Sequence, residues 1–205
     1  MIGNSFPQIQ QMYNGYSYTK ENSVHNLKCY SFPVTPPNLH SFELHKMAKL
    51  TDVLSAAVIN FGFIISDKAK NVIETFSLPS QSAFYRSSIY VKNEITHNYN
   101  FFYFIEDLSE YIDYDRTEFY LTDLDEKFDF FKVKSASELK TRRNQISTIK
   151  KIRTDKYFIK PSFTIPYDIF YISYADTRTY ISHRLKTALE EANITGIEIV
   201  PTDII

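Results

Sequence analysis

The chain has 205 residues, of which 43% are hydrophobic and 16% aromatic, and its formal net charge at pH 7 is −1. This length and hydrophobic content exclude a disordered chain and allow a substantial core in one domain or two small ones. No apolar run approaches the about 18 residues of a membrane-spanning helix, and the N-terminal residues do not resemble a signal peptide. The single cysteine, Cys29, cannot form an internal disulfide, so we expect a cytoplasmic protein.

The first part of the chain predicts loops and short elements. Residues 1–27 are rich in Asn, Gln, Ser and Tyr and are typical of loops, whereas residues 28–34 resemble a strand that ends before Pro36. Apolar residues alternate only briefly in residues 41–47, and residues 50–58 predict a short helix. We therefore divide the chain into an N-terminal polar and strand segment, residues 1–40, and a single α+β domain, residues 41–205.

One pattern occurs twice. Residues 65–74 and 181–190 are identical at four of ten positions, and each copy follows a short apolar run. Ser66 and Ser182 precede apolar residues at helical spacing, as expected for a serine whose hydroxyl accepts a free amide at the start of a helix. Each copy thus predicts a strand, a capping serine and an amphipathic helix, although two unrelated helices with the same cap would give this pattern too.

The second predicted helix should end near residues 193–196, because Asn and Gly readily adopt the left-handed conformation that ends helices. We expect residues 196–200 to form a closing strand.

Residues 84–91 and 99–105 are rich in aromatic and β-branched residues and predict a hairpin whose turn lies in residues 93–98. The four aromatic residues 101–104 could stack on nucleobases, but such a run is more typical of a strand buried on both faces. Residues 137–151 predict a weakly amphipathic helix, and residues 161–166 an internal hinge. Further strands are predicted at residues 119–121, 128–133, 157–159 and 169–174. Together these patterns predict an α+β fold with mainly antiparallel sheets, a few short helices and two similar strand–Ser-cap–helix units.

The charges are strongly segregated along the chain. Residues 106–129 carry ten acidic and two basic side chains, a net charge of −8, and residues 132–160 carry ten basic and two acidic ones, a net charge of +8. Such segments can steer a charged partner toward the protein. Alternatively, the two segments neutralise each other on the surface.

No catalytic or metal-binding pattern is present. The five histidines lack ligand spacing, the acidic segment lacks the glycine and glutamate of a calcium loop, and there is no glycine-rich phosphate loop. Cys29 could act as a thiol nucleophile, but its neighbours favour a small buried side chain. We therefore expect a protein that is not an enzyme and needs neither a metal ion nor a cofactor.

Five short segments resemble the immunity protein 11 family, which was earlier catalogued as a bacterial domain of unknown function. These segments are KLTDVL (49–54), IISDKAK (64–70), IDYDRT (112–117), YISHRLK (180–186) and TGIE (195–198). The resemblance spans about residues 40–200, with a departure at Thr117, where we expect serine. It implies a small cytoplasmic protein of a contact-dependent or polymorphic toxin system, one that protects its producer from a toxin, and it supplies no catalytic residues.

Two functions follow as hypotheses. The first is an immunity protein that binds and neutralises a cognate protein toxin, with no membrane partner. An acidic face would suit a basic toxin such as a nuclease, and its residues would be Asp107, Glu110, Asp113, Asp115, Glu118, Asp123 and Asp125. The second hypothesis, which we favour less, is a nucleic-acid-associated protein that uses the basic segment 132–160 and predicts salt-dependent binding.

Overall fold

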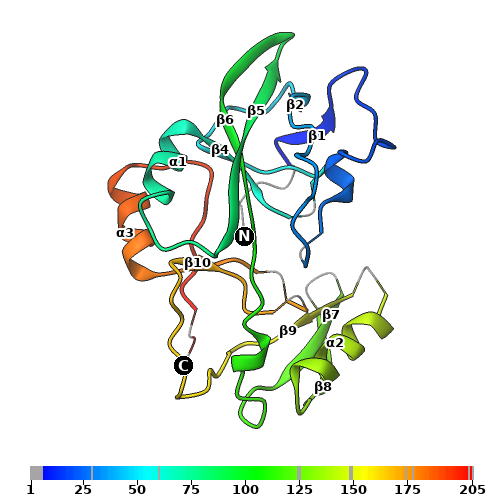
Figure 1. Ribbon diagram of the computed structural model, residues 1–205, viewed down its shortest axis with the longest axis vertical. Helices are drawn as coiled ribbons and strands as arrows, with labels where there is room; N and C mark the ends of the chain where they lie inside the picture. Colours follow the sequence, from blue (N-terminus) through cyan, green and yellow to red (C-terminus); the bar gives the residue numbers. More distant parts are fainter. Residues whose placement is uncertain are drawn as a thin grey trace. The chain divides into compact units, whose positions relative to one another are not determined.

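The computed structural model describes residues 7–28, 30–59, 61–123, 126–147, 150–173, 175–176, 178–202 and 204. Within these residues three α-helices accompany sheets that are mostly antiparallel (Figure 1), which confirms the predicted α+β fold. The chain forms two compact units, which we describe separately. Unit 1 comprises Met1–Ile105, Tyr167–Phe170 and Ile181–Val200, and unit 2 comprises Glu106–Pro166, Tyr171–Tyr180 and Pro201–Ile205.

Residue 40, where the sequence analysis divides the chain, lies inside unit 1. The hinge predicted at residues 161–166 lies at the end of the first segment of unit 2.

Unit 1 is built around a six-stranded sheet. Adjacent strands of this sheet are antiparallel, except that Phe42–Leu44 (β2) and Gln81–Val91 (β5) run parallel. An isolated bridge between Ile9 and Ala56 joins the first strand to the chain just beyond the last strand, so the sheet curves back toward itself. In spatial order the strands are β1 (Ile9–Met12), β2 (Phe42–Leu44), β5 (Gln81–Val91), β6 (Glu94–Ile105), β4 (Phe63–Ser66) and β3 (Val53–Leu54).

The predicted hairpin is the longest feature of this sheet. Strands β5 and β6 are joined at Lys92 and Asn93, whose φ angles of 50° and 71° are those of a tight two-residue turn. The turn is shorter than predicted, because most of residues 93–98 belong to β6. Residues 101–104 are fully buried, which confirms that this aromatic run packs on both faces of the sheet.

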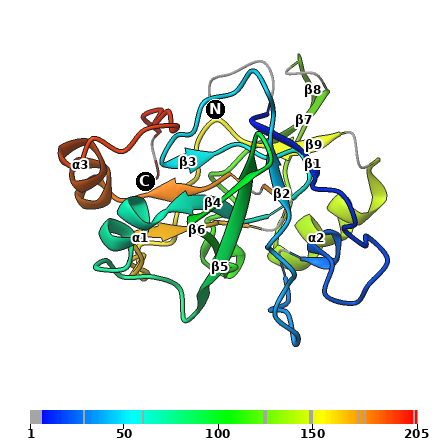
Figure 2. The same ribbon diagram turned by 90° about the horizontal axis from the view of Figure 1, so that it is seen from above.

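Both copies of the repeated pattern fold as predicted. In the first copy β4 leads into α1 (Asp67–Ile73), and Ser66 Oγ accepts the amide of Ala69 at 3.1 Å. In the second copy β11 (Tyr180–Ile181), which pairs with β10 (Ile169–Phe170), leads into α3 (His183–Glu191), and Ser182 Oγ accepts the amide of Leu185 at 3.1 Å. Helices α1 and α3 lie side by side in both views (Figures 1 and 2).

The end of the second helix also follows the prediction. Helix α3 stops at Glu191, and Asn193 and Gly196 then adopt φ angles of 50° and 88°.

Five local predictions are wrong. Residues 1–27, predicted as loops, contain β1, because Ile9–Met12 pair with β2. Residues 50–58 contain β3 instead of a helix, because Val53 and Leu54 pair with β4, and a short apolar run does not distinguish a strand from a helix. The described residues of 28–34 and those of 157–159 form only isolated bridges, without a ladder. Residues 196–200 are not a strand, since the left-handed Gly196 turns the chain away after one contact with Val53.

Unit 2 contains a smaller sheet and one helix. The sheet has the order β8 (Glu126–Phe131), β7 (Phe119–Asp123) and β9 (Lys151–Arg153), with both pairs antiparallel. Helix α2 (Ala136–Gln145) is capped by Ser135 and covers the first part of the helical stretch predicted at residues 137–151, beginning one residue before it. The core of unit 2 includes the fully buried Phe119 and Ile152. Two short 3-10 helices complete the fold: η1 (Val24–Asn26) in unit 1 and η2 (Ser109–Tyr111) in unit 2.

Candidate functional site

Five of the seven predicted acidic residues lie in one short stretch of unit 2, which we call the acidic segment, residues 107–118. Asp107 precedes η2 and accepts the amide of Ser109 at 3.1 Å, and Glu110 lies within η2. Asp113, Asp115 and Glu118 lie in the turns that lead into β7. These five residues thus lie within one twelve-residue stretch of unit 2.

The other two predicted residues do not belong to this group. Asp123 ends β7, five residues beyond Glu118, which in an extended strand corresponds to about 16 Å. Asp125 lies outside the described residues.

The acidic segment is held firmly by the chain that follows β9. The amide of Asp113 donates to the carbonyl of Phe158 at 2.8 Å, and the amide of Lys160 donates to the carbonyl of Tyr111 at 2.8 Å. The buried hydroxyl of Tyr114 also donates to the carbonyl of Ser109 at 2.8 Å. These hydrogen bonds fix the backbone of residues 109–114, which carries Glu110 and Asp113 and lies beside Asp115.

The carboxylates of the acidic segment are not neutralised by ion pairs. Among the described residues, no lysine or arginine side chain lies within 4 Å of any of these five carboxylates. Lys132 and Lys160 approach the segment, but they donate to the backbone carbonyls of Asp115 and Glu110. Glu110, Asp115 and Glu118 are exposed.

The basic segment 132–160 is used largely within unit 2. Arg142 pairs with Asp129 at 2.8 Å and lies over the ring of Phe131. Arg153 pairs at 2.6 Å with the fully buried Asp176. Lys150 and Lys156 also lie over aromatic rings, those of Phe128 and Phe158.

Mutual neutralisation therefore occurs in part. It joins β8 to α2 through Asp129 and Arg142. The pair of Lys127 and Asp155, at 2.6 Å, joins the minority charge of each stretch and does not neutralise the two stretches. Among the described residues no ion pair involves a carboxylate of the acidic segment. The carboxylates of this segment thus form no ion pair with a described residue, although Lys132 and Lys160 lie against its backbone and offset part of its negative charge. Much of the rest of the basic segment is engaged within its own unit.

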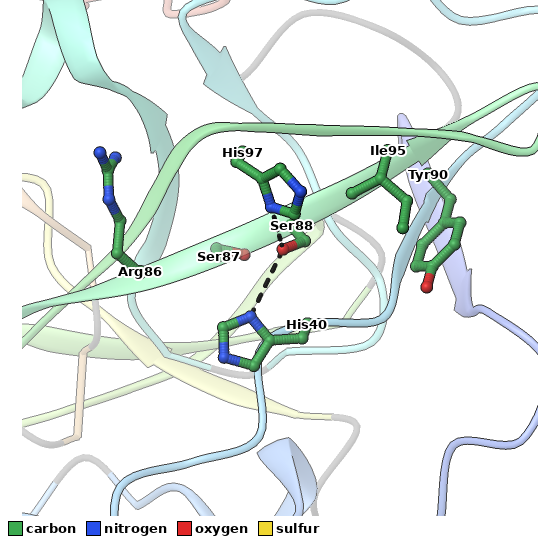
Figure 3. A pocket seen from close by; sticks show the side chains of 7 residues that line it. All are labelled: His40, Arg86, Ser87, Ser88, Tyr90, Ile95 and His97. Atoms are coloured by element: carbon green, nitrogen blue, oxygen red, sulfur yellow. Dashed lines mark hydrogen bonds between the residues drawn. The ribbon is translucent and has the colours of Figure 1, made fainter.

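A separate pocket of about 360 Å³ lies on the β5–β6 hairpin of unit 1 (Figure 3). At its centre the hydroxyl of the buried Ser88 lies 3.4 Å from Nδ1 of His40 and 3.0 Å from Nδ1 of His97. Strand β6 bulges here, because two of its residues, His97 and Asn98, lie opposite Ser88 of β5. The pocket is lined by His40, Arg86, Ser87, Ser88, Tyr90, Ile95 and His97.

This pocket does not assemble a nucleophilic site. The serine hydroxyl can donate to only one imidazole, so the other imidazole must donate to it. The remaining ring nitrogens point away from each other (Figure 3), and no carboxylate of the described residues holds either ring. The amide of Ser88 is occupied by the carbonyl of Leu39, at 3.1 Å, so it cannot stabilise an oxyanion. The hydrogen-bonded side chains of His40, Ser88 and His97 instead connect the loop before β2 to the β5–β6 hairpin.

The sequence does not predict this group of three side chains, because His40 and Ser88 are 48 residues apart and no local pattern links them. The described residues contain no group of three or more His, Cys, Asp or Glu side chains that could hold a metal ion, and Cys29 is outside them. Nor does the described part of the chain contain a helix of the length and hydropathy needed to cross a membrane.

Comparison with known proteins adds no assignment. No known protein family matches the chain, and no curated protein is similar to it. The resemblance to the immunity protein 11 family therefore stays a prediction.

Proposed function

We propose that this protein is a non-catalytic immunity protein of the bacterial cytoplasm, which binds a cognate protein toxin and neutralises it. The observation that carries the proposal is the acidic segment, with five carboxylates that are free of ion pairs to the described residues and three of which lie on or beside a fixed backbone. The resemblance of five segments of the chain to the immunity protein 11 family supports the same function.

The charge of the acidic segment favours a basic partner. Complementary charge raises the rate of encounter between two proteins and orients them before contact. A toxin that acts on nucleic acids presents a basic surface to its substrate, because phosphates are bound by lysine and arginine. An acidic segment that covers such a surface would block access of the nucleic acid.

If a gene beside that of this protein encodes a large secreted protein with a C-terminal toxin domain, that domain is the one to test. Cells that express the toxin domain should grow only when this protein is co-expressed. Growth arrest in spite of co-expression would contradict the immunity function.

The docking surface is tested by charge reversal. The triple variant Asp113→Lys, Asp115→Lys and Glu118→Lys should reduce the association rate constant about tenfold or more at low salt, with a smaller effect as salt screens the charges. Stopped-flow or surface-based kinetics at several salt concentrations measures this effect.

A matched control makes the same change of charge in unit 1. Glu94, Glu191 and Glu198 are exposed, and none of them pairs with a described basic side chain. Reversal of these three to lysine should leave the association rate nearly unchanged. Equal effects of the two triple variants would show that only net charge matters and would remove the acidic segment as the docking surface, without affecting the immunity assignment.

A further inference from the structure

Two aspartates of unit 1, to which the sequence gives no role, lie at equivalent places in the two repeated units. Asp52 lies 14 residues before the capping Ser66, and Asp168 lies 14 residues before the capping Ser182. Each aspartate accepts the hydroxyl of its own serine, at 2.8 Å and 2.5 Å respectively, and each backbone carbonyl accepts the amide of that serine. Each aspartate therefore fixes the start of its own helix.

The second oxygen of each aspartate binds the other repeat. Asp52 Oδ2 accepts the amide of Thr195 at 3.0 Å and its hydroxyl at 2.8 Å, and Thr195 follows α3. Asp168 Oδ2 accepts the amide of Ser77 at 2.9 Å, and Ser77 follows α1. Each aspartate thus joins the start of its own helix to the exit of the other helix.

The basic residues at the second helical position repeat this exchange. Lys68 lies 3.7 Å from Asp52 and donates to the carbonyl of Asn193, just beyond α3. Arg184 pairs with Asp168 at 2.6 Å and lies over the ring of Phe76, just beyond α1. The two sets of contacts have the same pattern with the repeats exchanged.

We propose that Asp52 and Asp168 form one reciprocal latch, in which the contacts of the two aspartates open and close together. The reason is mechanical. Helix α3 has nine residues and is about 13 Å long, so it moves as a rigid rod. Opening at Asp52 releases the exit of α3, and the displaced rod withdraws Ser182 at its other end from Asp168.

The latch therefore makes the C-terminal repeat dock on the N-terminal repeat as a single body. Asp168 is almost completely buried, with 3% of its side chain exposed, so it has no water to replace its protein partners when they leave. The latch is independent of the acidic segment and of the proposed function.

Hydrogen exchange of the full-length protein, followed by NMR, tests the latch at two amides. The amide of Thr195 reports on Asp52, and the amide of Ser77 reports on Asp168. The variant Asp52→Asn loses the charge and one of the two acceptor oxygens, so its side chain can no longer accept from both Ser66 and Thr195. Exchange should then rise about tenfold or more at Thr195 and, through the latch, also at Ser77. Asp168→Asn should have the same effect on both amides.

The matched control is Asp67→Asn. Asp67 is on α1 but binds Arg86 and Asn100, which lie outside the latch, so the exchange of Ser77 and Thr195 should stay within about twofold of the wild type. Should an aspartate variant fail to fold, Thr195→Val serves in its place, because it removes only the hydroxyl that faces Asp52. It should likewise accelerate the exchange of the Ser77 amide. The latch would be overturned if Asp52→Asn (or Thr195→Val) accelerated exchange only at Thr195 and Asp168→Asn only at Ser77.

Discussion

Gly196 lies directly against the backbone carbonyl of Val53, on the outer edge of β3. A Cβ atom on Gly196 would overlap that oxygen and would lie 2.5 Å from Oγ1 of Thr51. The φ angle of Gly196 is +88°, a conformation that side chains other than glycine rarely adopt. Here the chain after α3 packs against β3, and only glycine fits.

Replacement of Gly196 by alanine should therefore lower the free energy of unfolding by about 2–4 kcal/mol, from backbone strain and steric overlap together. The control is Gly15→Ala. Gly15 has a similar φ of +85° but no atom within 4 Å of the added Cβ, so only the strain remains, about 1–2 kcal/mol. Urea unfolding measures both changes, and equal losses would contradict the close approach to Val53.

The capping serines should contribute alike. Ser66→Ala and Ser182→Ala each remove one hydroxyl that accepts a helix amide, at a cost of about 1 kcal/mol. The same hydroxyls donate to Asp52 and Asp168, so each variant should lose more than the cap alone. Thermal or urea unfolding checks these values. Ser80 is exposed and forms no side-chain hydrogen bond to a described residue, so Ser80→Ala serves as the neutral control.

Stability should fall in acid because of Asp52 and Asp168. Burial raises the pKa of each carboxyl. Hydrogen bonds from the capping serine and from Thr195 or Ser77 lower the pKa by more than burial raises it, so both pKa values lie below the ordinary value. A carboxyl with a lowered pKa stabilises the fold above its unfolded pKa of about 3.9, and this stability is lost as the pH falls through the folded pKa.

The melting temperature should therefore be nearly constant from pH 7 to about 5 and drop below about pH 4. In the double variant Asp52→Asn and Asp168→Asn the starting value should be lower and the drop shallower. Asp67 and Asp155 also have lowered pKa values and leave a residual drop. Wild type and variant falling in parallel would contradict this assignment.

Asp176 should be the most sensitive charged residue of unit 2. Its side chain is fully buried between Arg153 and Arg178, which lie 2.6 Å and 2.5 Å from its oxygens. Asp176→Asn leaves two partly buried guanidinium groups without their counter-charge and should cost about 3–5 kcal/mol. Asp155 pairs with Lys127 but is 68% exposed, so Asp155→Asn should cost less than about 1 kcal/mol. Chemical denaturation of the two variants measures the contrast.

Much of the fold follows from local patterns in the sequence. The caps at Ser66 and Ser182, the end of α3 near Asn193 and the aromatic strand at residues 101–104 could all be predicted, because each depends on neighbours within a few residues. The errors at residues 50–58 and 196–200 have a different cause. The first is a strand only because β4 lies beside it, and the second is not a strand because Gly196 turns it away.

The candidate site shows the same division. The charge of residues 106–129 is a property of the sequence, and so is the duplication of the helical units. Only the tertiary structure decided which carboxylates stay free of ion pairs. Asp129 pairs with Arg142, whereas Asp113 forms no ion pair with a described residue. Likewise, only the tertiary structure brought Asp52 to Thr195, 143 residues away. Caps, turns and net charge are fixed by residues close together along the chain, but pairing across the fold depends on which distant segments meet.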